Sequence, residues 1–269
     1  MPGTGGTGPD TLTGMDTSAR NPWIVGRHSA GPAGLRLICV PQAGAGAGAF
    51  AGWRRHLPAG VELAPVELPG RGTRQDEPLP PEVATLADDL FQGLRPELSM
   101  PYVLVGHSLG GSLAYEVARR VEAHGLRAPL ALVVSGSRAP HVASLRTMSD
   151  KDEPALRGWL TANGGLPAEL LDYPSFLETI LQAVRADLRY AESYLVTDPP
   201  ALRCPLHVFG GLDDDITPPD QLGHWRRCAA GAFSVTTMRG GHSFPHADPG
   251  AMLAAIRGLL PGVLPTDRR

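Results

Sequence analysis

Cysteine is rare in this chain of 269 residues, which contains only Cys39, Cys204 and Cys228. The three are far apart in the sequence and show none of the short spacings that hold a metal ion. Two of them lie in or beside apolar runs. We therefore expect reduced, largely structural thiols and no metal site.

The chain also lacks a long apolar run and a cluster of basic residues. No uncharged stretch approaches the length of a membrane span, and the first 22 residues lack the basic start and apolar centre of a signal peptide. The net charge is −3, and no basic cluster could follow a phosphate backbone. These absences predict a soluble, cytoplasmic protein without a membrane or nucleic-acid partner.

The length suits one large α/β domain and is short for two independent ones. Residues 1–22 are rich in Gly, Thr, Pro and Ser, so we expect them to form a disordered N-terminal extension. Residues 23–269 are expected to form the single folded domain.

Short apolar runs alternate with helical patterns from Leu35 onward. Nearly continuous apolar strands separated by amphipathic helices are typical of a mainly parallel sheet that is covered on both faces. With right-handed crossovers, the economical architecture is a three-layer α/β sandwich. The predicted strands are Leu35–Val40, Val61–Glu67, Tyr102–Gly106, Leu130–Ser135, Leu206–Gly210 and Phe233–Met238.

One stretch, about residues 140–200, breaks this alternation because it contains no predicted strand. Helical patterns there cover Pro154–Asn163, Ala168–Leu171 and Tyr173–Leu195. An insertion of this size predicts a helical lid over the carboxyl edge of the sheet. Most of its apolar side chains are expected to pack the lid onto the sheet, and some to line an acyl-sized channel.

The segment Tyr102–Gly111 ends an apolar strand with Gly-His-Ser-Leu-Gly-Gly and leads directly into a helical pattern. Such a Gly-x-Ser-x-Gly turn, the nucleophile elbow, holds a serine hydroxyl clear of the neighbouring backbone. Gly106 and Gly110 leave room for the sharp turn. We therefore expect Ser108 to be a catalytic nucleophile and the Leu109 N–H to be one donor of an oxyanion hole.

A serine hydroxyl needs a base in order to attack near neutral pH, and the base needs an orienting acid. The acid is expected just beyond a strand end, where Leu206–Gly210 leads into an Asp-rich turn. A Gly-x-x-Asp pattern counted from Gly211 indicates Asp214, and the same pattern counted from Gly210 indicates Asp213. We favour Asp214 and keep Asp213 as the alternative.

The base is expected in the loop after the last strand, where two glycines precede His242. The glycines allow the backbone to bend and bring His242 back over the sheet edge. His246 is the weaker candidate, and His107, inside the elbow, is expected to pack or to form hydrogen bonds. The chain order of serine, acid and histidine is the one found in α/β-hydrolases.

The second oxyanion donor is expected in the loop after Leu35–Val40, which consists mainly of small residues. They allow a backbone N–H, that of Ala43 or of its neighbour Gln42, to approach a substrate oxygen closely. The same loop supports a rival interpretation, because Gly44–Ala49 partly matches a dinucleotide-binding fingerprint with Glu67 about 20 residues further on. That alternative leaves the elbow, the histidine loop and the strand-end acid unexplained.

In their order and spacing these segments resemble the type II (editing) thioesterases of polyketide synthase and nonribosomal peptide synthetase systems, within the α/β-hydrolase superfamily. The resemblance covers most of Leu35–Leu260. One departure is Gln42, which stands where such proteins usually have histidine. The segments that carry the resemblance are Pro41–Gly44, Glu67–Gly72, Gly106–Gly111, Ser135–Pro140, Arg185–Leu188 with Tyr194, and Gly240–Phe244.

The resemblance implies hydrolysis of acyl groups from the phosphopantetheine arm of an acyl or peptidyl carrier protein. His242 would take the proton of Ser108, Asp214 would steady the imidazolium, and the N–H groups of Leu109 and Ala43 would hold the oxyanion. No metal or organic cofactor is expected. The alternatives are a general carboxylesterase, a macrocyclising thioesterase, and a hydrolase-fold receptor that binds a ligand without turnover.

Overall fold

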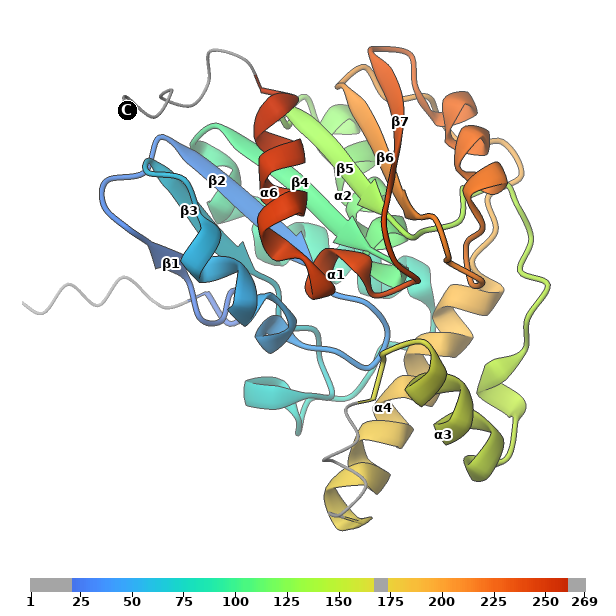
Figure 1. Ribbon diagram of the computed structural model, residues 1–269. Coiled ribbons are helices and arrows are strands. Elements are labelled where there is room, and N and C mark those ends of the chain that lie inside the picture. The colour runs from blue at the N-terminus through green and yellow to red at the C-terminus, as the bar shows by residue number, and fades with distance from the viewer. Residues whose placement is uncertain (1–20, 167–173, 261–269) are drawn as a thin grey trace, which may run out of the picture.

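A mainly parallel β-sheet forms the centre of the structure (Figure 1). The computed structural model describes residues 21–166 and 174–260. Within those residues seven strands lie in the order β1-β3-β2-β4-β5-β6-β7, and β1 alone is antiparallel to its neighbour. The strands are β1 His28–Ser29, β2 Leu35–Val40, β3 Val61–Pro65, β4 Tyr102–His107, β5 Ala131–Ser135, β6 Leu206–Gly211 and β7 Phe233–Met238.

The central strands are continuous apolar runs because both of their faces are covered. Every residue of β4, β5 and β6 is buried, whereas the edge strand β7 alternates between half-buried and exposed positions. All six predicted strands are confirmed to within two residues at their ends. The two-residue β1 was not predicted, because a strand of that length has no periodicity.

Helices on both faces complete three layers (Figure 1). On one face α1 (Val83–Leu94) and α2 (Leu109–Ala123) pack against the sheet in a large apolar cluster. On the other face α6 (Pro249–Gly258) and a 3₁₀ segment, Ala47–His56, form a second cluster that includes Trp53. The three-layer α/β-hydrolase sandwich expected from the sequence is therefore confirmed.

Two helices of the insertion, α3 (Glu153–Ala162) and α4 (Pro174–Ser193), lie beyond the carboxyl ends of the strands (Figure 1). Helical patterns predicted both, and the third, Ala168–Leu171, lies outside the described residues. An apolar cluster of their own joins α3 and α4. Its buried members are Leu156, Leu160, Leu166, Leu177, Leu181, Val184 and Leu188.

The start of the chain was expected to form an extension as far as residue 22, but residues 1–20 lie outside the described part. Asn21 already belongs to the folded domain. Its side-chain amide donates hydrogen bonds to the Gly93 carbonyl at 2.8 Å and to Glu97 at 3.0 Å. The folded domain therefore begins at or before Asn21.

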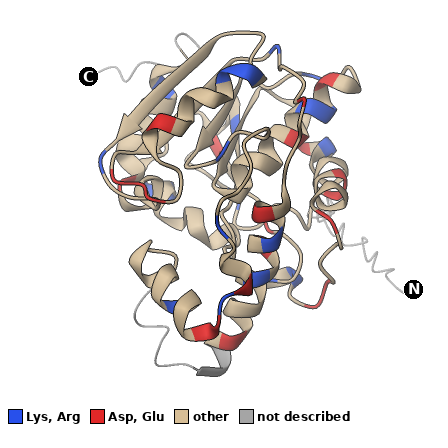
Figure 2. Cartoon of the chain, turned by 90° about the vertical axis from the view of Figure 1, so that its right-hand side faces the viewer, with Lys and Arg blue, Asp and Glu red and all other residues tan. Residues whose placement is uncertain are grey.

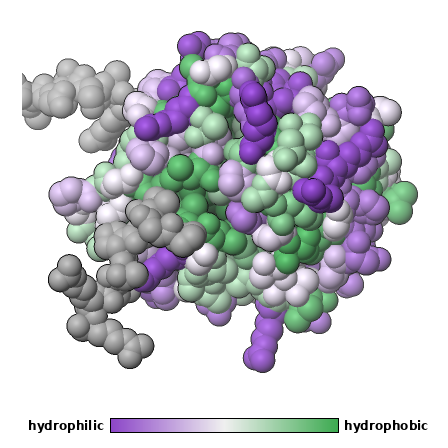
Figure 3. All heavy atoms as spheres, turned by 90° about the horizontal axis from the view of Figure 1, so that it is seen from above, coloured by the Kyte–Doolittle hydropathy of each residue, from purple (hydrophilic) through white to green (hydrophobic). Residues whose placement is uncertain are grey.

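The surface mixes charges of both signs. Figure 2 shows acidic and basic residues interspersed along the chain on one side of the molecule. Figure 3 views the end opposite the insertion helices, where hydrophilic side chains surround a smaller apolar area. A membrane-spanning helix is absent from the described residues, since none there is both long and apolar enough. Cytoplasmic location stays a prediction.

The three cysteine thiols are buried and make no disulfide. Burial raises the pKa of Cys204 and of Cys228 to about 12, and that of Cys39 further. Because the thiolate is the reactive form, we expect no reaction of the native protein with the thiol reagent DTNB. All three thiols should react after unfolding in guanidinium chloride. Rapid reaction of any thiol in the native state would contradict this prediction.

Candidate active site

Ser108 lies at the sharp turn between β4 and α2. Its φ of 54° is the only positive value among the described non-glycine residues. The turn brings backbones into close contact, because a Cβ on Gly106 would lie 2.1 Å from the Gly110 carbonyl oxygen. A Cβ on Gly110 would lie 2.2 Å from the carbonyl oxygen of Val40, the last residue of β2. Both positions therefore require glycine, and the turn has the geometry of a nucleophile elbow.

Asp214 follows β6 in the Asp-rich turn, and its side chain is fully buried. The carboxylate Oδ1 accepts hydrogen bonds from the N–H groups of Ile216 at 2.8 Å and Thr217 at 2.9 Å. Oδ2 accepts one from His242. Asp213 and Asp215 are exposed. Of the two acids considered from the sequence, the structure thus places Asp214 at the histidine and turns Asp213 toward solvent.

His242 follows β7, and its Nδ1 donates to Asp214 Oδ2 at 2.9 Å. The turns after the two strands are tied together, since the Asp213 N–H donates to the Gly240 carbonyl at 3.0 Å. Gly240 has a φ of +108°, which a residue with a side chain rarely adopts. These contacts fix the acid and the histidine relative to each other before any substrate binds.

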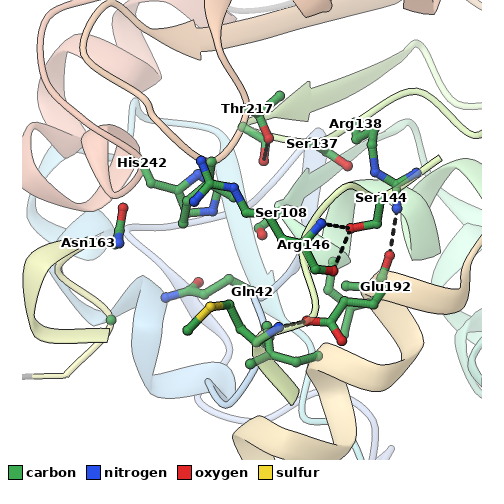
Figure 4. Close-up of a pocket in the computed structure, with 18 of the residues that line it drawn as sticks. Gln42, Ser108, Ser137, Arg138, Ser144, Arg146, Asn163, Glu192, Thr217 and His242 are labelled. Atoms are coloured by element: carbon green, nitrogen blue, oxygen red, sulfur yellow. Dashed lines mark hydrogen bonds between the residues drawn. The ribbon is translucent and has the colours of Figure 1, made fainter. Parts of the chain in front are cut away.

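Ser108 and His242 line the same cavity (Figure 4). Among the described residues no hydrogen bond joins Ser108 Oγ to the His242 ring. With Nδ1 bound to Asp214, Nε2 is the nitrogen free to accept the serine proton. Such catalytic hydrogen bonds commonly tighten only when a substrate is bound.

His107 packs behind the histidine of the site. Its ring centroid lies 5.0 Å from that of His242, and its Nδ1 donates to the Ser135 carbonyl at 3.0 Å. Burial lowers the pKa of His107 well below its usual range, and the electrostatic interaction with the neighbouring His242 and His246 rings lowers it further. His107 is therefore a neutral packing and hydrogen-bonding residue, as expected from the sequence.

The loop after β2 reaches the cavity with Gln42 and Ala43, and Leu109 reaches it from the start of α2. Within the described residues the backbone N–H groups of all three lack a hydrogen-bond acceptor. Leu109 thus lines the cavity beside Ser108, and its role as one oxyanion donor stays a prediction. Ala43 and Gln42 both remain available for the other.

His246 is bound to this loop rather than to the acid. Its Nε2 donates to the side-chain oxygen of Gln42 at 3.0 Å. Sequence reasoning missed this contact, although Gln42 was visible as a departure from the usual histidine. The pairing joins residues that are 204 positions apart, so no local signal could have revealed it.

The carboxylate of Glu67, which the dinucleotide interpretation would place on a ribose, is used by the protein itself. Its Oε2 accepts the Ala47 N–H at 2.5 Å. A Cβ on Gly46 would lie 2.6 Å from the same oxygen. The loop therefore closes onto Glu67 and leaves it 4% exposed.

The cavity above Ser108 has a volume of about 420 Å³. Ser108, His242 and Ala43 belong to its wall on the sheet side, and Trp159 and Leu188 come from the insertion helices α3 and α4. Figure 4 shows Glu192, also on α4, and Arg138 at the same cavity. Its lining combines apolar side chains with about as many polar and charged ones, so the cavity offers both apolar surface and hydrogen-bonding groups to a small organic ligand.

A parallel sheet with a serine elbow after β4, an acid after β6 and a histidine after β7 defines an α/β-hydrolase. The chain belongs to the thioesterase domain family, whose sequence model matches residues 35–259.

Among its relatives, the antimetabolite synthetase AmbE of Pseudomonas aeruginosa is 38% identical over 93% of this chain and 12% of its own length. The probable cadicidin biosynthesis thioesterase of Streptomyces griseus is 33% identical over 86% of this chain and 63% of its own length. The matched regions thus span less than two thirds of both relatives. The solved structure of RedJ, a thioesterase of the prodiginine pathway in Streptomyces coelicolor, is 35% identical with a TM-score of 0.79 over 90% of this chain and 99% of RedJ.

His246 should make the stability of the protein depend on pH. Burial lowers its pKa to about 4, whereas an unfolded histidine titrates near 6.5. The unfolded state therefore binds the proton first, so this stabilisation is complete above about pH 6.5 and is lost as the pH falls toward 4. Between about pH 7 and about pH 5 we expect a loss of about 2 kcal/mol from this group.

Urea unfolding of the wild type and of His246→Gln at both pH values measures this contribution. The variant should lose less unfolding free energy on acidification than the wild type. Equal losses in both proteins would contradict the prediction.

Proposed function

We propose that the protein hydrolyses acyl thioesters on the phosphopantetheine arm of a carrier protein, through an acyl-serine intermediate. The observation that carries this proposal is the hydrogen-bonded Asp214–His242 pair beside Ser108 at the cavity of about 420 Å³. In this proposal the insertion helices act as the lid of an acyl channel. Family membership and the named relatives support the choice of a thioester over other acyl compounds.

The proposed steps assign a role to each residue of the site. His242 Nε2 takes the proton as Ser108 Oγ attacks the thioester carbonyl carbon, and Asp214 stabilises the imidazolium. The N–H groups of Leu109 and of Ala43 hold the oxyanion. The C–S bond then breaks, and His242 protonates the departing thiol. Water activated by His242 hydrolyses the acyl-serine and regenerates Ser108.

The carrier protein as a partner rests on the relatives. RedJ is a thioesterase of a prodiginine pathway, and another solved structure with a TM-score of 0.80, YbtT, is a type II thioesterase of the yersiniabactin pathway. Enzymes of that type act on intermediates bound to carrier proteins. We extend this partner to the present chain, with an editing role that removes unwanted acyl groups.

Replacing Ser108 by Ala should abolish thioester hydrolysis, because no other group can form the acyl intermediate. We expect the rate of acid release from acyl-carrier protein and from acyl-N-acetylcysteamine to fall by a factor on the order of 10³ or more. Mass spectrometry of the carrier and of the released acid provides the measurement. Equal turnover by the wild type and Ser108→Ala would overturn the proposal.

Other substrates, product analysis and active-site labelling separate the alternatives. A general carboxylesterase would hydrolyse p-nitrophenyl esters faster than acyl-carrier protein, and a macrocyclising enzyme would release a ring instead of the free acid. A receptor without turnover would not be labelled by a fluorophosphonate. Labelling that is absent from Ser108→Ala but present in the wild type would exclude the receptor.

The two neighbouring acids provide a matched pair of variants. Asp214→Asn leaves a buried amide at His242 and should reduce kcat by about 10²–10⁴-fold, because the imidazolium loses its partner. Asp213→Asn alters an exposed side chain and should change kcat by less than about twofold. Steady-state kinetics of both variants measure the two changes in kcat. A greater loss in Asp213→Asn would reassign the acid.

A further inference from the structure

The loop from Gln42 to Ala45 lies between a strand and a 3₁₀ segment, and contacts from distant elements hold it. One of them comes from the insertion. The Gly44 N–H donates to Asp187 Oδ2 at 2.7 Å, and Asp187 lies on α4 with a fully buried side chain. A backbone amide of the candidate oxyanion loop thus depends on a carboxylate 143 positions away.

Arg71 completes this contact. Its two terminal nitrogens bind the two oxygens of Asp187, with Nη2 to Oδ1 at 2.9 Å. The Nη1 that binds Asp187 also donates to the Ala45 carbonyl at 3.2 Å. The Nε donates to the Pro69 carbonyl at 3.1 Å. Arg71 neutralises the buried charge of Asp187, and the two side chains together bind the loop at the Gly44 N–H and at the Ala45 carbonyl.

The loop packs so closely against α4 that Gly44 has no room for a side chain. Gly44 has a φ of +75°, and a Cβ there would lie 2.1 Å from Cγ2 of Val184. Val184 precedes Asp187 by three positions, so both lie on one face of α4. The backbone at Gly44 therefore rests directly on the helix, at the same place where the carboxylate binds it.

We propose that Asp187 is a positioning residue, which fixes the oxyanion donor of the loop through the Gly44 amide. Ala43, the residue next to Gly44, lines the cavity together with Ser108. The insertion then does more than cover the acyl group, because α4 sets the place of an amide that binds the transition state. This inference rests on the proposed function in one respect: it assumes acyl transfer at Ser108.

The variant Asp187→Asn tests this coupling with little change in shape. The single oxygen of an Asn side chain cannot replace both carboxylate oxygens. If it takes the place of Oδ2, it still accepts from Gly44 and from Arg71 Nη1, but the NH₂ group then faces Arg71 Nη2. In either orientation a donor faces a donor and Arg71 loses its counter-charge, so Arg71 and the loop that it holds are displaced. Because removing an oxyanion donor costs about 10²–10³-fold in kcat, we expect this displacement to lower kcat by about tenfold or more, with KM within about twofold of the wild type.

The matched control is Glu116→Gln. Glu116 is also a buried carboxylate held by arginine, since Arg119 binds it at 2.6 Å. It also accepts the hydroxyl of Tyr194, the residue that follows α4, at 2.8 Å. Glu116 therefore anchors the same insertion to the body of the domain but makes no contact with the loop. We expect Glu116→Gln to destabilise the protein to a similar degree and to leave kcat within about twofold.

A trifluoromethyl ketone analogue of the thioester separates positioning from general loosening. It adds to Ser108 and forms a tetrahedral oxyanion, so its Ki should rise in Asp187→Asn by about the factor lost in kcat/KM and stay unchanged in Glu116→Gln. Equal effects in the two variants, or a change in KM alone, would overturn the inference.

Two further measurements keep the result decisive. If Asp187→Asn fails to fold, Arg71→Lys takes its place. This variant keeps the positive charge but loses the bidentate contact with Asp187. We then expect a smaller decrease in kcat than for Asp187→Asn, with KM unchanged. Labelling of Ser108 by a fluorophosphonate depends on the oxyanion hole but requires no thioester substrate. A slower rate in Asp187→Asn therefore supports the inference even if the protein hydrolyses no thioester, and an unchanged rate contradicts it.

Discussion

The backbone turn at Ser108 is the constraint on which the rest of the site depends. A φ of 54° is unfavourable for a residue with a side chain, and it persists only where the surroundings leave no alternative. Here the surroundings are backbone atoms, because Gly110 touches the end of β2 and Gly106 touches Gly110. The buried strand β4 and the helix α2 are thereby locked at an angle that presents the serine hydroxyl. The stability of the three-layer core maintains this local strain.

The parallel arrangement explains why the remaining groups meet there. Carboxyl ends of parallel strands share one edge of the sheet, so loops after β2, β4, β6 and β7 all open toward the same cavity. Hydrogen bonds between the turns then set the fine geometry. The Ser108 N–H, for example, donates to the Ser135 carbonyl at the end of β5 at 2.9 Å.

Sequence patterns predicted most of the fold and the residue types of the site, because both depend on local features. Apolar strands and the Gly-x-Ser-x-Gly turn are visible within ten residues. The sequence favoured Asp214 but kept Asp213 as an alternative, since the choice depends on which side chain the turn buries against His242. The sequence could not predict the contacts of Gln42 with His246 and of Gly44 with Asp187, because they join segments that only the folded chain brings together.

The insertion makes two kinds of contact, apolar packing and buried ion pairs, which differ in how strictly they fix the position of a helix. Its apolar cluster holds α3 and α4 together, but apolar contacts are non-directional and allow helices to shift. Buried ion pairs add little net stability, yet they have strict geometry and are costly to break singly. The ion pair of Asp187 with Arg71 holds α4 itself, and Tyr194, the residue that follows α4, donates its hydroxyl to Glu116. The helix is therefore held along its length and at its end. The anchor at Asp187 also holds Gly44. A displacement of α4 must therefore either break that anchor or carry the candidate oxyanion loop with it.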